Sequence, residues 1–213
     1  IQHPKERYML NEWIFITQLK KEGILAPRFD FVRVYINGEA WGIYAIEEFF
    51  RKELVESQHR REGVIVKFND DLSWGGHDKT EYLPEDTGTI VEPFDTKTVF
   101  NDTDKSYLFS NAKEKLNGVM NKQFAISKVF DTKLLAKYWA LCDLFDALHG
   151  LLSFNLRFYY NPITGLLEPV HYDGDTGIND FRKLVGFSNP PIMWGISDIK
   201  FMKLYINELV KFQ

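Results

Sequence analysis

Apolar residues recur along the first part of the chain with two different periods, which predict one helix followed by strands. Residues 6–22 are expected to form an amphipathic helix that ends at Gly23, with two alternative apolar stripes: Met9, Trp13, Ile16 and Leu19, or Leu10, Ile14 and Phe15. Bulky and β-branched side chains then predict a strand over 29–36 and a return strand over 41–46. The pair Asn37-Gly38 between them predicts a tight hairpin turn, because both residues tolerate positive φ.

The rest of the chain predicts more helix than strand. A short helix is expected over 49–57 and a third strand over 63–68, followed by a surface insertion over about 69–103 that holds one short strand at 89–91. Helices are predicted over 104–122 and 131–148, the second with Asp131 as its N-cap, and Ser197 is expected to cap a last helix. Between them, residues 155–175 form a hairpin that turns at 161–165. This order predicts an α+β fold with mainly antiparallel hairpins in the N-terminal part and a helical C-terminal part.

Composition narrows the protein class. The chain of 213 residues is 45% hydrophobic and 15% aromatic, which indicates one globular unit. A net charge of −4 without a basic stripe argues against general nucleic-acid binding, and no apolar run is long enough to predict a membrane span. Cys142 is the only cysteine, so no internal disulfide can form, and its apolar surroundings predict a buried thiol. The chain begins without methionine and stops within a helical pattern, so we expect a fragment of a longer protein.

The two ends of the second hairpin carry the strongest chemical signal. Asn155 precedes its first strand, and Asp173 and Asp175 follow its return strand. A hairpin brings its outer ends together, which would place an amide oxygen beside two carboxylates. Hard oxygen ligands of this kind suit Mg²⁺ that carries the phosphates of a nucleotide. The alternative is that both aspartates are solvated turn residues.

Three further side chains are candidates for the same site. Lys67 ends an apolar strand, which would aim its ammonium group at the α- and β-phosphates, and Glu48 is a candidate ion-pair partner for it. His149 is a candidate general base. Each also has a structural interpretation: a solvated strand-end lysine, a glutamate at a helix N-terminus, and a histidine at a helix C-terminus. A weaker alternative is a metal-dependent hydrolase that uses His149, His171 and Asp173.

Two blocks of the chain resemble the spore-coat-protein-H (CotH) family of atypical kinases. The first reads Ala26-Pro27, Phe31-Val32-Arg33-Val34-Tyr35-Ile36-Asn37-Gly38-Glu39, Gly42-Ile43-Tyr44 and Glu48, and the second reads Asn155, Phe158-Tyr159-Tyr160, a Pro-x-Thr-Gly turn and Tyr172-Asp173-Gly174-Asp175. The resemblance implies a divergent, protein-kinase-like fold that binds ATP with Mg²⁺ or Mn²⁺ and phosphorylates Ser or Thr hydroxyls of proteins. It also implies a single kinase-like domain over 1–213, with an N-lobe-like part over about 1–100 and a C-lobe-like part over about 104–213.

The same resemblance implies roles for individual residues. Lys67 matches the lysine that holds the phosphates, and Glu48 matches the glutamate that follows the first hairpin. Asn155 and Asp173 match the asparagine and aspartate that bind the metal, and Asp175 matches the second acid of that motif. The resemblance further suggests a bacterial surface, exported or spore-associated protein.

The chain departs from the family pattern at one position. The family usually carries an aspartate a few residues before the asparagine, where it accepts the proton of the attacking hydroxyl, and this chain has Leu148, His149 and Gly150 there. Three interpretations remain open: His149 acts as the base, Asp146 reaches the site, or nucleotide binds without efficient transfer. The alternative function is therefore a catalytically impaired pseudokinase, or a surface module that binds protein or glycan through an aromatic face with Trp41, Trp74, Trp139 and Trp194.

Overall fold

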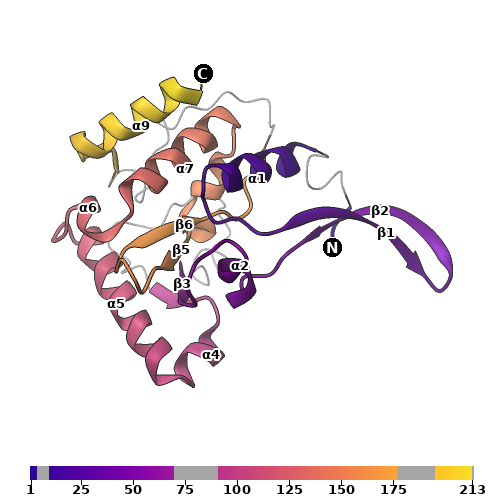
Figure 1. The fold of residues 1–213 in the computed structure, drawn as a ribbon, viewed down its shortest axis with the longest axis horizontal. Helices are drawn as coiled ribbons and strands as arrows, with labels where there is room; N and C mark the ends of the chain where they lie inside the picture. The colour runs from indigo at the N-terminus through magenta and orange to yellow at the C-terminus, as the bar shows by residue number, and fades with distance from the viewer. Residues whose placement is uncertain (4–9, 70–90, 177–194, 213) are drawn as a thin grey trace, which may run out of the picture.

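A four-stranded antiparallel sheet lies at the centre of the molecule, with strand order β4-β3-β5-β6. The computed structural model describes residues 1–3, 10–69, 91–176 and 195–212. The sheet contains β3 (Val64–Phe68), β4 (Val91–Pro93), β5 (Arg157–Tyr160) and β6 (Leu167–Val170). Figure 1 shows that β3, β5 and β6 lie between the long helices and the short helix α2 (Lys52–Glu56).

Side chains that alternate along the central strands fill two separate cores. Val64, Val66 and Phe68 of β3 belong to the larger core, whereas Ile65 belongs to a smaller one on the opposite face. The larger core lies under α5 (Thr103–Met120) and α7 (Thr132–Leu144), and α9 (Ile199–Phe212) packs on α7. The smaller core lies under α2. Because both faces are covered, the strands read as nearly continuous apolar runs instead of alternating ones.

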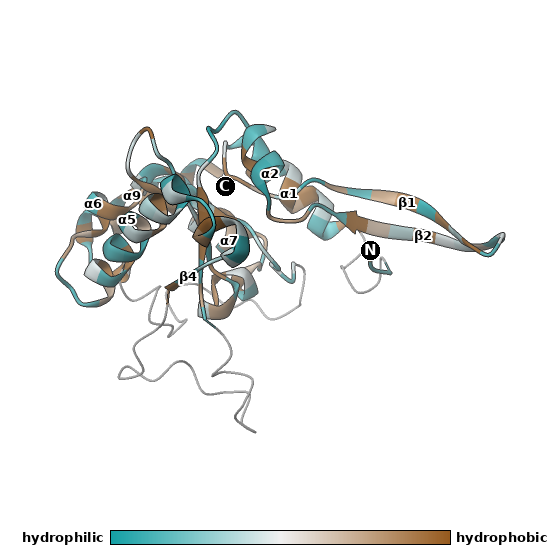
Figure 2. Ribbon diagram, turned by 90° about the horizontal axis from the view of Figure 1, so that it is seen from below, coloured by the Kyte–Doolittle hydropathy of each residue, from teal (hydrophilic) through white to brown (hydrophobic). Residues whose placement is uncertain are grey.

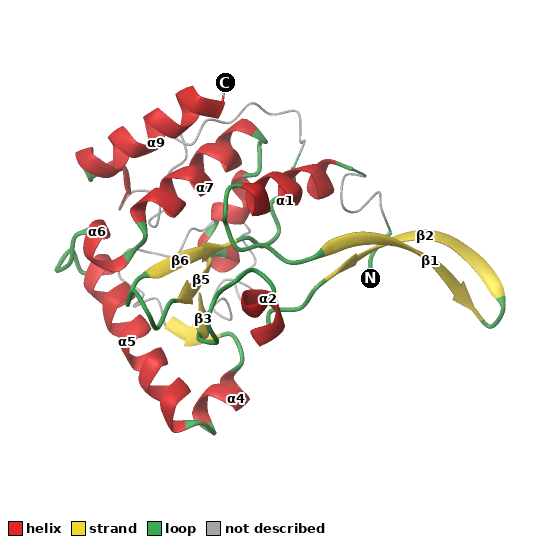
Figure 3. Cartoon of the chain, viewed as in Figure 1, coloured by secondary structure: helices red, strands yellow, loops and turns green. Residues whose placement is uncertain are grey.

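The described residues contain further helices (Figure 3). These are α1 (Asn11–Lys21), α4 (Thr96–Phe100), α6 (Ile126–Val129) and the 3-10 turns η2 (Leu148–Leu151) and η3 (Ser153–Asn155). The α+β class with antiparallel sheets is therefore confirmed. Within the described ranges, no helix combines the length and apolar character that a membrane crossing requires.

A second, two-stranded sheet projects from the body as a ribbon (Figures 1 and 2). It pairs β1 (Phe29–Ile36) with β2 (Glu39–Glu47), and Asn37 and Gly38 turn it with φ of 52° and 85°. The predicted hairpin and its turn chemistry are thus confirmed, because positive φ at both central residues matches the twist of the strands. The ribbon carries apolar and polar segments along its exposed length (Figure 2).

Several predicted details of the helices were wrong. The buried face of α1 holds Glu12, Phe15, Ile16 and Leu19, whereas Leu10, Trp13 and Ile14 are exposed, so neither predicted stripe is correct. Residues 6–9 of that predicted helix lie outside the described ranges. Asp131 caps α7 as predicted, by accepting hydrogen bonds from the backbone N–H groups of Lys133 and Leu134. That helix nevertheless ends at Leu144, and Asp198 rather than Ser197 accepts the first-turn N–H bonds near the start of α9.

The predicted insertion over 69–103 contributes to the core. Its described part contains β4, which pairs with β3, and α4, whose N-cap is Asp95. Val91 and Val99 are buried in the larger core. Residues 70–90, with Trp74 and the start of the predicted strand at 89–91, lie outside the described ranges, as do Trp194 and the predicted irregular stretch at 189–191.

Candidate functional site

Three neighbouring strands of the central sheet have their ends on the same side, and several of the predicted site residues lie at or next to these ends. Lys67 lies opposite Arg157, and Arg157 lies opposite Val170. Because the strands are antiparallel, the end of β3, the start of β5 and the end of β6 share this edge. Asn155 comes just before β5, and Asp173 comes just after β6, so the hairpin closes on them as predicted.

The turns η2 and η3 position His149 against Asn155. The Asn155 side chain is 4% exposed, and its Nδ2 donates to the backbone oxygen of His149 at 3.0 Å. Nδ2 also lies 3.1 Å from Nδ1 of the His149 ring. These contacts fix the orientation of the amide, because Asn155 cannot rotate without losing both of them.

The two aspartates approach the same imidazole from the loop after β6. Nδ1 of His149 lies 3.5 Å from Oδ2 of Asp173 and 3.8 Å from Oδ2 of Asp175. It also lies 3.0 Å from the backbone oxygen of Asp173. One ligand atom from each of these three side chains lies within 4.8 Å of the other two. All three are about one-third exposed, so a ligand from solution can reach them.

The backbone of this loop adopts left-handed conformations that turn both acids to the same side. Asp173 and Asp175 have φ of 48° and 54°. Aspartate tolerates this region better than most residues, because its short side chain can hydrogen-bond locally. Positive φ at both Asp173 and Asp175 is therefore a distinctive feature of this loop.

Close packing holds the loop against η2 at two glycines. A Cβ at Gly150 would lie 3.0 Å from the backbone oxygen of Tyr172 and 3.3 Å from the Tyr138 hydroxyl. A Cβ at Gly174 would lie 2.9 Å from the His171 ring. An aspartate at position 150 would therefore fit only with a shift of the loop backbone.

His171 lies beneath the site and not in it. The ring is fully buried, with Nε2 at 3.0 Å from Glu12 Oε1 and Nδ1 at 3.3 Å from the Tyr138 hydroxyl. The hydroxyl of Thr176 donates to the other Glu12 oxygen at 3.4 Å. The metal-capable group among the described residues contains His149, Asp173 and Asp175 without His171. His171 is therefore not part of this group, in which the hydrolase alternative would use it.

Lys67 and Glu48 are positioned by different parts of the structure. Lys67 shares the α2 face of the sheet with Ile65, and β3 contacts η3, which ends at Asn155. Glu48 accepts hydrogen bonds from the backbone N–H of Arg28 at 3.0 Å and from its guanidinium at 2.5 Å. This contact raises the pKa of Arg28. The ion pair between Lys67 and Glu48 stays a prediction.

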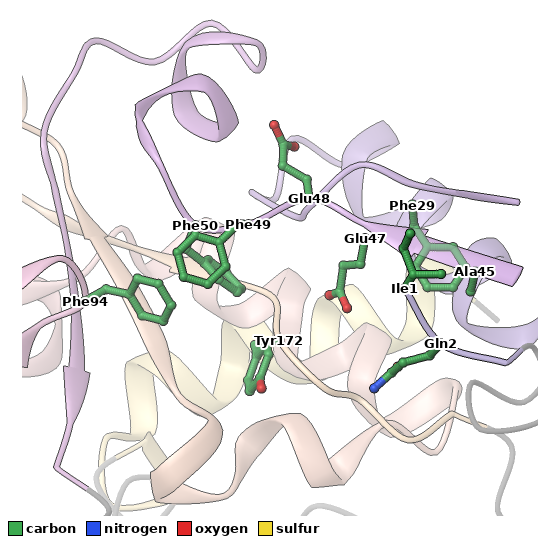
Figure 4. Close-up of a pocket in the computed structure, with 10 residues that line it drawn as sticks. All are labelled: Ile1, Gln2, Phe29, Ala45, Glu47, Glu48, Phe49, Phe50, Phe94 and Tyr172. Carbon is green, nitrogen blue, oxygen red and sulfur yellow. The ribbon is translucent and has the colours of Figure 1, made fainter. Parts of the chain in front are cut away.

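A cavity of about 240 Å³ lies next to the acidic loop (Figure 4). Its walls come from the base of the ribbon, the β2–α2 connection, the residue after β4 and the residue before Asp173. The aromatic side chains among them are Phe29, Phe49, Phe50, Phe94 and Tyr172. In Figure 4, Phe50, Phe94 and Tyr172 surround one end of the cavity, and Glu47 and Gln2 lie at the other.

Two residues near the site were missed by reasoning from the sequence. Arg157 is buried, and its guanidinium carbon lies 4.8 Å from the Tyr172 ring centroid, while Nη1 donates to the Phe154 oxygen at 2.7 Å. Glu12 joins α1 to the buried histidine. Its helical spacing from Phe15 and Ile16 was a usable signal, because it places a carboxylate on the buried face of α1.

The side chains of Cys142 and Trp139 are buried, so they cannot contact a ligand from solution. Cys142 is buried, which confirms the predicted buried thiol, and this burial raises its pKa well above the usual range. Trp139 is also buried, in the larger core, whereas Trp41 is exposed on the ribbon. Trp139 therefore cannot contribute to an exposed aromatic binding face.

Comparison with known proteins gives one result. A family model described as CotH kinase protein matches residues 6–208, nearly the whole chain. No curated protein matches the chain.

Proposed function

The chain belongs to the CotH kinase family, and from this membership and the site geometry we propose that it binds ATP with a divalent cation and transfers phosphate to a hydroxyl of a protein. The observation that carries the proposal is the convergence of Asn155, Asp173 and Asp175 around His149 at one sheet edge. These residues come from two segments on opposite sides of the β5–β6 hairpin. If Asp173 and Asp175 were only solvated turn residues, we would not expect both to lie beside the Asn155 amide and the same imidazole.

The donor set fits a divalent cation. Octahedral Mg²⁺ or Mn²⁺ with ligands at about 2.1 Å separates them by about 3.0 Å when adjacent and about 4.2 Å when opposite. The ligand atoms of Asp173 and Asp175 lie within 4.8 Å of each other, so small rotations bring the two carboxylates to that spacing. Asp173 and Asp175 would hold the ion, and Asn155 would complete its protein ligands. The bound cation would neutralise the phosphate charge that develops during transfer.

The aromatic cavity suits the base of the nucleotide. Its volume of about 240 Å³ is smaller than a site for a whole drug-sized ligand, which spans about 300–1,000 Å³. A purine can stack on the rings of Phe50, Phe94 or Tyr172. Tyr172 lines the cavity and directly precedes Asp173, so the acids lie close in the chain to the proposed base site. Lys67, on the α2 face of the same sheet, would bind those phosphates, with Glu48 as the proposed partner that orients it.

Transfer needs positioning more than covalent chemistry by the protein. The transition state for phosphoryl transfer is loose, so held phosphates and a neutralised charge supply most of the acceleration. The imidazole of His149 is a candidate proton acceptor when it does not bind the cation. The division into an N-lobe-like part over about 1–100 and a C-lobe-like part over about 104–213 remains part of this proposal.

Nucleotide binding is tested by thermal unfolding with ATP and Mg²⁺ or Mn²⁺. Saturation at about a hundred times Kd stabilises the folded state by about 2.7 kcal/mol, which raises Tm by about 5–10 °C for a chain of this size. Asp173→Ala should remove the shift, and Asp104→Ala, an exposed aspartate at the start of α5, should retain it. Equal shifts in wild type and Asp173→Ala would remove Asp173 from the site.

Phosphate transfer is tested separately with γ-labelled ATP and a generic protein substrate. Labelled Ser or Thr in wild type, absent in folded Asn155→Ala protein, supports a kinase. Nucleotide-dependent stabilisation without any transfer would instead support the catalytically impaired alternative.

A further inference from the structure

The ring of His149 lies close to both aspartates of the site. Its Nδ1 faces one oxygen of each aspartate, at 3.5 Å and 3.8 Å. These separations fall between the adjacent and opposite ligand spacings of an octahedral ion, which are about 3.0 Å and about 4.2 Å. The imidazole is therefore placed where a third ligand would lie, and Asn155 holds the η2 backbone there by donating to the His149 backbone oxygen.

Imidazole changes which cation a site prefers. Carboxylate and amide oxygens suit Mg²⁺, which binds nitrogen ligands weakly, whereas first-row transition ions accept imidazole readily. A site with two carboxylates and one imidazole therefore loses preference for Mg²⁺ relative to Mn²⁺ or Co²⁺. An aspartate in place of His149 would restore an all-oxygen donor set.

We propose that His149 is itself a metal ligand, and that it shifts the cation preference of this site from Mg²⁺ toward Mn²⁺ and Co²⁺. This proposal rests on the cation site of the proposed function, and adds to it the identity of the ion and a ligand outside the family pattern. Asp173 and Asp175 supply the two carboxylates, and Nδ1 of His149 supplies the nitrogen.

Coordination has a consequence for the proton chemistry. A neutral imidazole has one lone pair, so Nδ1 can bind the cation only when the ring proton is on Nε2. Neither nitrogen then accepts a proton from an attacking hydroxyl. His149 therefore does not act as the general base while the ion is bound, and transfer depends on charge neutralisation and positioning. When the ion binds, Asn155 loses its contact with Nδ1 and keeps its hydrogen bond to the His149 backbone oxygen.

The first test measures binding of the metals alone, without nucleotide. Titration calorimetry with Mn²⁺, Co²⁺ and Mg²⁺ should give tighter binding of Mn²⁺ and Co²⁺ to wild type. In His149→Asp, the ratio of Mn²⁺ to Mg²⁺ affinity should fall by about 10- to 100-fold, the size of effect that ligand environments have on metal affinity. His59→Gln, which changes an exposed histidine outside the site, should leave that ratio unchanged.

The second test detects the nitrogen directly. Pulsed electron paramagnetic resonance of the Mn²⁺-loaded protein should show modulation from a coordinated imidazole ¹⁴N in wild type and His59→Gln. The signal should be absent in His149→Gln, whose fold is checked by circular dichroism. An unchanged affinity ratio in His149→Asp, or no ¹⁴N modulation in wild type, would overturn the proposal. Stabilisation by ATP with Mg²⁺ that depends on Asp173 would still support the proposed function in that case, so the two failures are distinguishable.

Discussion

Glu12 binds the segment that carries Asp173 and Asp175, and its replacement should lower the stability of the protein. The carboxylate is 2% exposed and accepts from His171 Nε2 at 3.0 Å and from the Thr176 hydroxyl at 3.4 Å. These two donors belong to the segment that carries Asp173 and Asp175. In Glu12→Leu, which has a side chain of similar size, both donors stay buried while their acceptor is gone.

The size of the effect follows from the two orphaned donors. Each buried donor without an acceptor costs about 1–3 kcal/mol, so Glu12→Leu should lower the free energy of unfolding by about 2–6 kcal/mol. For a protein of this length, each kcal/mol lowers Tm by about 2–4 °C. Glu12→Gln keeps an oxygen acceptor for His171, and the Thr176 hydroxyl can turn to accept from the new amide. Its cost should stay within about 1 kcal/mol.

Urea unfolding followed by circular dichroism, and a thermal scan on the same samples, measure this difference. We expect the order wild type, Glu12→Gln, Glu12→Leu in falling stability, with most of the loss in the last step. If Glu12→Leu is as stable as Glu12→Gln, the hydrogen bonds to His171 and Thr176 do not stabilise the loop, and the reasoning is refuted.

Two further predictions concern packing and pH. Gly150→Asp returns the acid of the family pattern. It should destabilise the fold by about 1–3 kcal/mol without raising phosphate transfer, because its Cβ would lie 3.0 Å from the Tyr172 oxygen. Increased transfer in the labelled-ATP assay would contradict this prediction. Burial, followed by the charge of Glu168, raises the pKa of Tyr159 to about 12. Since the unfolded phenol ionises near pH 10, stability should fall between about pH 10 and 12, by at most about 1.4 kcal/mol per pH unit. Denaturant midpoints against pH should show that slope in wild type, and its persistence in Tyr159→Phe would assign it to another group.

Local features of the chain were predictable because their causes lie within a few residues. The turn at Asn37-Gly38 follows from the φ values that those residues tolerate, and the cap of α7 follows from the short carboxylate of Asp131. The antiparallel strands β1, β2 and β3 follow from their bulky residues. The approach of Asn155 to Asp173 also followed from the sequence, since a hairpin joins its own ends.

Long-range contacts could not be predicted in the same way. Neither stripe proposed for α1 was correct, because the buried face also includes Glu12, whose carboxylate accepts a hydrogen bond from His171, a residue far along the chain. The burial of Val91 and Val99 likewise depends on the pairing of β4 with β3.

The sequence by itself determined the α+β class, the family and the polar groups that the second hairpin brings together. Only the tertiary structure decided that His149 lies among those groups, that His171 lies beneath them, and that a side chain at Gly150 would fit only if its neighbours shift. The physical reason is that hydrogen-bond and turn preferences act over a few residues, whereas close packing and burial depend on segments that meet only in the folded chain.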